Sequence, residues 1–214
     1  MGCFPFFVDI EGAKGVIVGG GKVAARKAEK LIPFGPALTV IAPGMDDHFF
    51  RLEKMLAQNR ETGAKISLVQ RKLTEEDLAD AAFVIAATDD EAVNGQISEY
   101  CRKHRIPVNV VDDREKCTFF FPALAKDGPL TVGISTDGKS PAAAAYVRKE
   151  IEQKLPDGMG KTVELLGQLR PEVMELCDDQ SERANILEKL FWYCLRREGD
   201  VTFSELRGLL HGMR

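Results

Sequence analysis

Three small residues near the start of the chain have the spacing of a turn that binds phosphate groups. Gly19, Gly21 and Ala24 form a G-x-G-x-x-A pattern between the apolar run 16–18 and a segment with helical periodicity. In such a turn the first glycine permits a tight bend, the second lets the backbone approach a pyrophosphate, and the alanine allows close helix packing. Free N–H groups at the helix start would face the anion. The pattern predicts a dinucleotide site; the alternative is a glycine-rich turn without a ligand.

The acidic residue that usually binds the ribose of NAD, about 20 residues further on, is absent. Its place reads Val-Ile-Ala-Pro-Gly at 40–44, without an arginine for the 2′-phosphate of NADP. The ribose must be held by backbone groups around Pro43 and Gly44, or by a later group such as Asp46 or Asp47. This gap weakens the choice of NAD over NADP more than it weakens the prediction of a dinucleotide.

Aspartates follow two of the apolar runs. Asp112 comes directly after the run 108–111, and ligands of open α/β sheets bind beyond the carboxyl ends of the strands. A carboxylate placed there could act as a general base beside a nicotinamide; the alternative is that it caps a turn. Asp89 and Asp90 follow the run 83–87 and precede a helix, so capping explains them without chemistry.

A second helix start combines Ser140 at the N-cap with Pro141 at the first helical position. The amides of the same helix start could also bind an anion, with Lys139 beside them. Capping alone and anion contact both remain open.

The elements that must position these residues follow from the pattern of hydrophobicity. Five short apolar runs alternate with longer, polar-faced stretches, at 15–18, 38–41, 66–69, 83–87 and 108–111. Continuous apolar runs separated by helices are typical of a parallel sheet buried on both faces. The first part of the chain is therefore predicted to be a Rossmann-like, doubly wound α/β domain.

The pattern changes after Val111. Strand-like runs at 117–120 and 130–135 flank an Asp-Gly-Pro turn and predict a short β extension. From Pro141 onward, apolar residues recur at helical spacing and predict a small C-terminal helical domain. The expected domains are 1–113 for dinucleotide binding, 114–150 for dimerisation and 151–214 for the helices. The extension is too short to bury its own apolar residues, which indicates a symmetric homodimer.

Composition excludes several classes of protein. Lys and Arg number 29 against 33 for Asp and Glu, so the net charge of −4 predicts no general attraction to nucleic acid or to anionic lipid. No apolar stretch reaches the roughly 20 residues of a membrane-spanning helix. Five cysteines, never in a C-x-x-C pair, indicate free thiols in a reducing cytoplasm and no zinc site.

The chain resembles the precorrin-2 dehydrogenase family, the stand-alone form of the dehydrogenase and ferrochelatase half of siroheme synthase. The order and spacing of the matching segments cover residues 4 to about 155. They are Phe4-Pro5, Val-Gly-Gly-Gly-Lys-Val-Ala-Ala-Arg-Lys at 18–27, Ala-Ala-Thr-Asp-Asp at 86–90, Asn-Val-Val-Asp at 109–112, Phe-Phe-Phe-Pro-Ala at 119–123 and Ser-Thr-Asp-Gly-Lys-Ser-Pro at 135–141.

This resemblance implies NAD-dependent oxidation of precorrin-2 to sirohydrochlorin by a homodimer; some family members also insert iron. Asp112 matches the family's active-site aspartate, and Ser140 matches a serine of its tetrapyrrole pocket region. The expected cofactor site comprises Gly19, Gly21, Lys22, Val23, Pro43, Gly44 and Thr88. Because the substrate carries many carboxylates, Arg114, Lys116, Lys126 and Lys139 are candidates to bind them, although each also fits an ordinary solvated charge.

A function of another class also fits the glycine turn. The α/β domain could bind NAD as a regulatory sensor that controls a partner through the helical tail. That hypothesis does not explain the match of Asp112 and of the segment 119–141 to an enzyme family. Turnover of NAD with a reduced tetrapyrrole separates the two functions.

Overall fold

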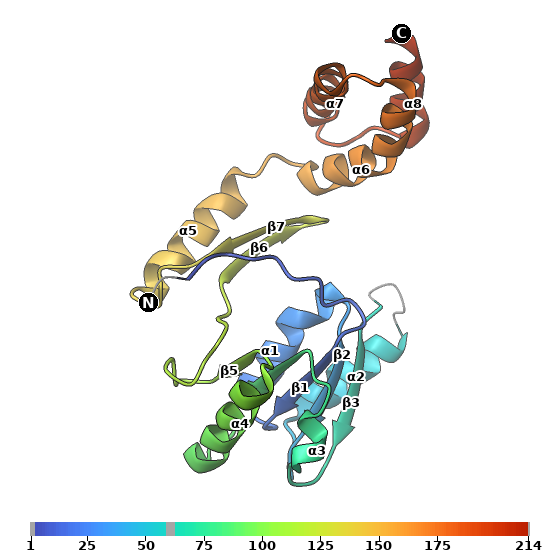
Figure 1. Ribbon diagram of the computed structural model, residues 1–214. Helices are drawn as coiled ribbons and strands as arrows, with labels where there is room; N and C mark the ends of the chain where they lie inside the picture. Colours follow the sequence, from blue (N-terminus) through green and yellow to red (C-terminus); the bar gives the residue numbers. More distant parts are fainter. Residues whose placement is uncertain (1–2, 59–62, 214) are drawn as a thin grey trace. The chain divides into compact units, whose positions relative to one another are not determined.

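The computed structural model describes residues 3–58 and 63–213 (Figure 1). The chain divides into two compact units, each described here by itself. Phe6–Phe121 form one, and Pro122–Arg214 with Met1–Pro5 form the other. The division into three domains at 113 and 150 stays a prediction.

The first unit is built on a five-stranded parallel sheet with the strand order β3-β2-β1-β4-β5. The strands are β1 (Lys14–Val18), β2 (Ala37–Ile41), β3 (Lys65–Val69), β4 (Phe83–Ala86) and β5 (Val108–Val110). The chain runs outward from β1 through β2 to β3 and then returns to β4 on the other side of β1. This confirms the doubly wound sheet and puts its topological switch point between β1 and β4, where such sheets bind ligands.

Helices cover both faces of this sheet, which explains why the strands read as continuous apolar runs (Figure 1). The helices are α1 (Lys22–Leu31), α2 (Asp47–Gln58), α3 (Glu75–Leu78) and α4 (Glu91–His104). Ile17 and Ile85 pack in one core with α1 and α2, while Val16 and Val84 pack in the other with α3 and α4. Alternate residues of each strand therefore enter different cores.

The segment 117–120 is not the first strand of the hairpin, so that prediction was wrong. Thr118 donates from its backbone N–H to the Val108 carbonyl at 2.8 Å, and the ring of Phe119 meets that of Phe83 edge-on. Contacts with the sheet override the high β propensity of these aromatic residues. The hairpin consists of β6 (Ala123–Asp127) and β7 (Leu130–Ile134), which pair antiparallel.

The second unit continues from this hairpin into helices, as the periodicity predicts. They are α5 (Pro141–Lys154), α6 (Met159–Leu176), α7 (Gln180–Leu195) and α8 (Phe203–Gly212). A small core around Leu169, Leu190 and Leu206 joins the last three. No helix within the described ranges is long and apolar enough to cross a membrane.

Candidate functional site

Two glycines of the turn after β1 are required by the chain's own backbone. Gly19 has a φ of 120°, and a Cβ there would overlap the Ala87 carbonyl oxygen. A Cβ at Gly20 would overlap the Gly44 carbonyl oxygen. The loops that follow β2 and β4 therefore lie directly against the glycine turn.

Gly21 has no such requirement. Its φ of −81° and ψ of 176° suit any residue, and a Cβ there would meet no atom within 4 Å. It is the N-cap of α1, where no side chain caps the helix and no acidic residue stands in the first turn. The first amide groups of a helix lack helical acceptors and attract anions. The turn thus presents uncapped amides, including those of Lys22 and Val23, beside open space, which fits a pyrophosphate.

The loop after β2 contains the expected second cofactor segment. Asp46 donates from its N–H to the Gly20 carbonyl at 2.8 Å, and its carboxylate accepts from the His48 N–H at 2.9 Å. The Asp46 carboxylate is thereby used at the start of α2. Pro43 and Gly44 are exposed, and a Cβ at Gly44 would meet open space, so backbone at these two residues fits a ribose.

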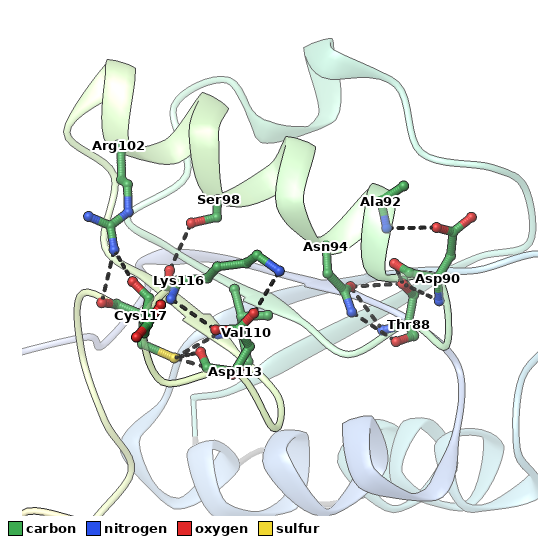
Figure 2. A network of polar contacts seen from close by, with 11 residues as sticks. Thr88, Asp90, Ala92, Asn94, Ser98, Arg102, Val110, Asp113, Lys116 and Cys117 are labelled. Atoms are coloured by element: carbon green, nitrogen blue, oxygen red, sulfur yellow. Dashed lines mark hydrogen bonds and ion pairs between the residues drawn. The ribbon is translucent and has the colours of Figure 1, made fainter.

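Thr88 is anchored in the loop after β4, as Figure 2 shows. Its hydroxyl donates to Asn94 Oδ1 at 2.8 Å, and Asn94 Nδ2 donates back to the Thr88 carbonyl at 2.9 Å. Asp90 Oδ1 accepts from the Ala92 N–H at 2.9 Å, which confirms that Asp90 caps α4. Because the hydroxyl of Thr88 serves the loop, its backbone next to Gly19 is the part that fits a cofactor.

Asp112 lies in the turn after β5 with a left-handed φ of 61° and an exposed side chain. Among the described residues its carboxylate has no hydrogen bond and no ion pair. The neighbouring Asp113 does the capping: its Oδ1 accepts from the Lys116 N–H at 3.2 Å. This division of roles favours a general base over a cap at Asp112.

The basic residues of the same loop are engaged by neighbours. Lys116 Nζ lies 2.6 Å from Asp113 Oδ2, and this hydrogen bond lowers the pKa of Asp113 and raises that of Lys116. The Arg114 guanidinium lies 5.0 Å from the centroid of the Phe120 ring.

Ser140 and Lys139 belong to the second unit. The Ser140 hydroxyl accepts from the Ala143 N–H at 3.2 Å, so it caps α5. The Ser140 N–H in turn donates to Thr136 Oγ1 at 3.2 Å. The Lys139 side chain is exposed. Capping is thus present, and anion binding here stays a prediction.

Sequence analysis missed a polar cluster between α1 and β5. Lys27 Nζ donates to Asn109 Oδ1 at 3.3 Å, and Asn109 is almost fully buried. The sequence signal for this cluster was a polar Asn within the apolar run 108–111. Only the strand register shows that this Asn faces α1. No group of three or more His, Cys, Asp or Glu side chains within residues 3–58 and 63–213 is arranged to hold a metal ion.

Two family models match the chain in succession. One, described as putative NAD(P)-binding, covers residues 6–123, and the other, described as sirohaem biosynthesis protein central, covers 127–154. A solved structure titled SirC, precorrin-2 dehydrogenase, shares the fold with a TM-score of 0.69 at 23% identity, and the match covers 99% of this chain and 98% of that one.

The curated relatives of similar sequence include siroheme synthases. The siroheme synthase of Psychrobacter sp. (strain PRwf-1) is 36% identical over 191 residues, which make up 89% of this chain and 38% of the relative. That of Nitrosospira multiformis is 37% identical over 190 residues, or 89% of this chain and 39% of the relative. The chain thus spans less than half the length of these relatives. It belongs to the putative NAD(P)-binding family whose model matches residues 6–123, and the sirohaem biosynthesis central model matches the segment that follows.

Proposed function

We propose that this chain oxidises precorrin-2 to sirohydrochlorin with NAD as the hydride acceptor. The observation that carries the proposal is Gly21, which the protein's own packing does not require and which opens an uncapped helix start at the switch point of the sheet. The precorrin-2 dehydrogenase that shares this fold supplies the substrate, and the siroheme synthases supply the biosynthetic context.

The residues around the switch point would hold NAD in three places. Backbone amides at Lys22 and Val23 would bind the pyrophosphate, and backbone at Pro43 and Gly44 would bind a ribose. The Thr88 loop would flank the cofactor next to Gly19. Bound NAD would supply the acceptor for a hydride.

The proposed reaction removes a hydride and a proton from the substrate, and both losses are needed to extend its conjugation. Bound NAD would supply the hydride acceptor, and Asp112 would accept the proton. Its exposed carboxylate suits this task because no neighbouring residue in the described part of the chain occupies it. Arg114, Lys116, Lys139 and the Ser140 helix start are the groups proposed to meet substrate carboxylates.

We also propose that the chain acts as a homodimer in the cytoplasm. An isolated two-stranded sheet such as β6–β7 is marginally stable, so its faces need a further partner. On α5 the side chains of Tyr146 and Val147 are 63% and 40% exposed, and Val147, Ile151 and Leu155 line a shallow apolar groove. These surfaces would pair between subunits. All five cysteines are free, which suits a reducing compartment.

The test is to incubate the purified protein with precorrin-2 and NAD, and to follow NADH and sirohydrochlorin by absorbance. Both products should appear in equal amounts. Binding of NAD without formation of either product would overturn the proposal and favour the regulatory sensor. Adding ferrous ion after the oxidation then measures iron insertion as a separate activity.

A further inference from the structure

One cation of α1 lies half-buried, whereas the other cations of that helix, Lys22, Arg26 and Lys30, are exposed. Lys27 Nζ lies 3.3 Å from Asn109 Oδ1 and 3.9 Å from the centroid of the Phe121 ring. An ammonium over an aromatic face is attracted by the ring quadrupole. Within the described residues Lys27 has no carboxylate at ion-pair distance.

The amide of Asn109 is fixed in an orientation that serves this lysine. Asn109 Nδ2 donates to the Phe119 carbonyl at 3.0 Å and lies 3.5 Å from Cys117 Sγ. The carbonyl oxygen Oδ1 must therefore face Lys27. Asn109 ends a cross-strand row whose other members, Leu68, Val40, Ile17 and Ile85, are apolar. A buried amide in such a row is costly unless it is hydrogen-bonded. Lys27 supplies the hydrogen bond to the Asn109 carbonyl oxygen.

These contacts hold both chain segments that flank the Asp112 loop. Asn109 belongs to β5, which enters the loop, while Phe119 and Phe121 belong to the segment that leaves it. Cys117 Sγ adds two contacts between these segments. It accepts from the Val110 N–H at 3.1 Å and donates to the Asp113 carbonyl. The position of Asp112 therefore depends on contacts that converge on Asn109 and Lys27.

The charges of the cluster interact as well. The pKa of Lys27 is lowered, first by burial and then by the like charge of Lys30 one turn away on α1. Cys117 and Asp112 act in the opposite direction and favour the charged amine. The carboxylate that the proposed reaction uses is thus one of the groups that favour the charged form of Lys27.

We propose that Lys27 is a positioning residue for Asp112. Its ammonium contacts Asn109 Oδ1 and the ring of Phe121. It thereby fixes the two segments that flank the Asp112 loop and places a positive charge near the carboxylate. Lys27 itself transfers no proton. Its role in turnover rests on the proposed function, whereas its coupling to Asp112 does not.

A titration of the free protein tests the coupling. The Cε resonance of Lys27 is followed by NMR in the wild type, in Asp112→Asn and in the matched control Asp113→Asn, whose carboxylate pairs with Lys116. Lys27 should titrate below the exposed lysines. Asp112→Asn should lower its midpoint further, because the Asp112 carboxylate favours the charged amine. Asp113→Asn should leave it unchanged. An identical midpoint in Asp112→Asn and wild type overturns the proposal.

The rate of precorrin-2 oxidation tests the positioning role. Lys27→Met should lower kcat by roughly 10- to 100-fold with NAD affinity retained, because a misplaced catalytic group costs about that much. Lys30→Met removes the same charge from an exposed site and should keep the wild-type rate. Lys27→Arg should restore most of the rate and move the alkaline limb of the pH profile upward, because arginine stays charged.

Wild-type kcat in Lys27→Met refutes the positioning role. If Lys27→Met does not fold, the pH profile of Lys27→Arg decides: an alkaline limb identical to that of the wild type overturns the proposal. A wild-type protein that forms no NADH would refute the proposed function alone, since the NMR titration needs no turnover.

Discussion

The glycine turn allows a substitution that separates ligand binding from folding. Gly21→Asp places a side chain in open space at the N-cap of α1, with a backbone conformation that suits any residue. Aspartate is a better N-cap than glycine, so the free energy of unfolding should rise by a few tenths of a kcal/mol. The same carboxylate would face the pyrophosphate of a bound dinucleotide. At about 4 Å and an effective dielectric constant near 20, two unit charges repel by about 4 kcal/mol.

That repulsion predicts a loss of NAD affinity of roughly 1,000-fold, measured by titration calorimetry alongside thermal unfolding. Gly21→Asn has nearly the same size without the charge and should lose much less. Gly167→Asp, at another helical glycine with open space around it, is the matched control and should bind NAD normally. NAD affinity of Gly21→Asp within a few-fold of wild type would refute the placement of the pyrophosphate at this turn.

Three further predictions address the base, the assembly and acid stability. Asp112→Asn should lower the oxidation rate by about 100-fold or more with NAD affinity retained, the usual contribution of a general base; a rate within a few-fold of wild type would refute that role. Light scattering should give twice the chain mass of 23.6 kDa, and the monomer mass at micromolar concentration would refute the homodimer. Hydrogen bonds from Arg71 at 2.6 Å hold the pKa of Asp77 well below its ordinary 3.8. A lowered folded-state pKa stabilises the fold above the unfolded value and loses that effect as pH falls, so Arg71→Met should lower Tm at pH 6 more than at pH 2. An equal drop in Tm at both pH values would contradict this reasoning.

The sheet could be predicted because its strands are buried on both faces and therefore read as separate apolar runs. The strand predicted at 117–120 failed for a tertiary reason. A row of three phenylalanines has high β propensity, but Phe119 and Phe121 pack on the core beneath α1 instead of pairing with β7. Sequence alone does not reveal which of two surfaces an aromatic residue will cover.

The sequence predicted a phosphate-binding glycine turn, but it did not predict which of its glycines the folded chain requires. The G-x-G-x-x-A pattern treats Gly20 as a variable position, yet a Cβ there would collide with the Gly44 carbonyl. Gly21, which the pattern requires, is sterically free in the folded chain. The constraint at Gly20 arises from a loop 24 residues further along, so it depends on a close approach that spacing does not encode.

The order of the strands explains why the two halves of the proposed site stand where they do. The glycine turn follows β1, and Asp112 follows β5, with β4 between them. Two strand spacings amount to about 10 Å, which leaves room for a ribose and ring to lie between the pyrophosphate and the base. The end of β4 fits this arrangement because Thr88, Asp90 and Asn94 satisfy one another, so the loop can flank a ligand without competing for it. Among the described residues, the Asp112 carboxylate has no hydrogen bond or ion pair, whereas Asp90 caps α4 and Asp113 accepts from the Lys116 N–H.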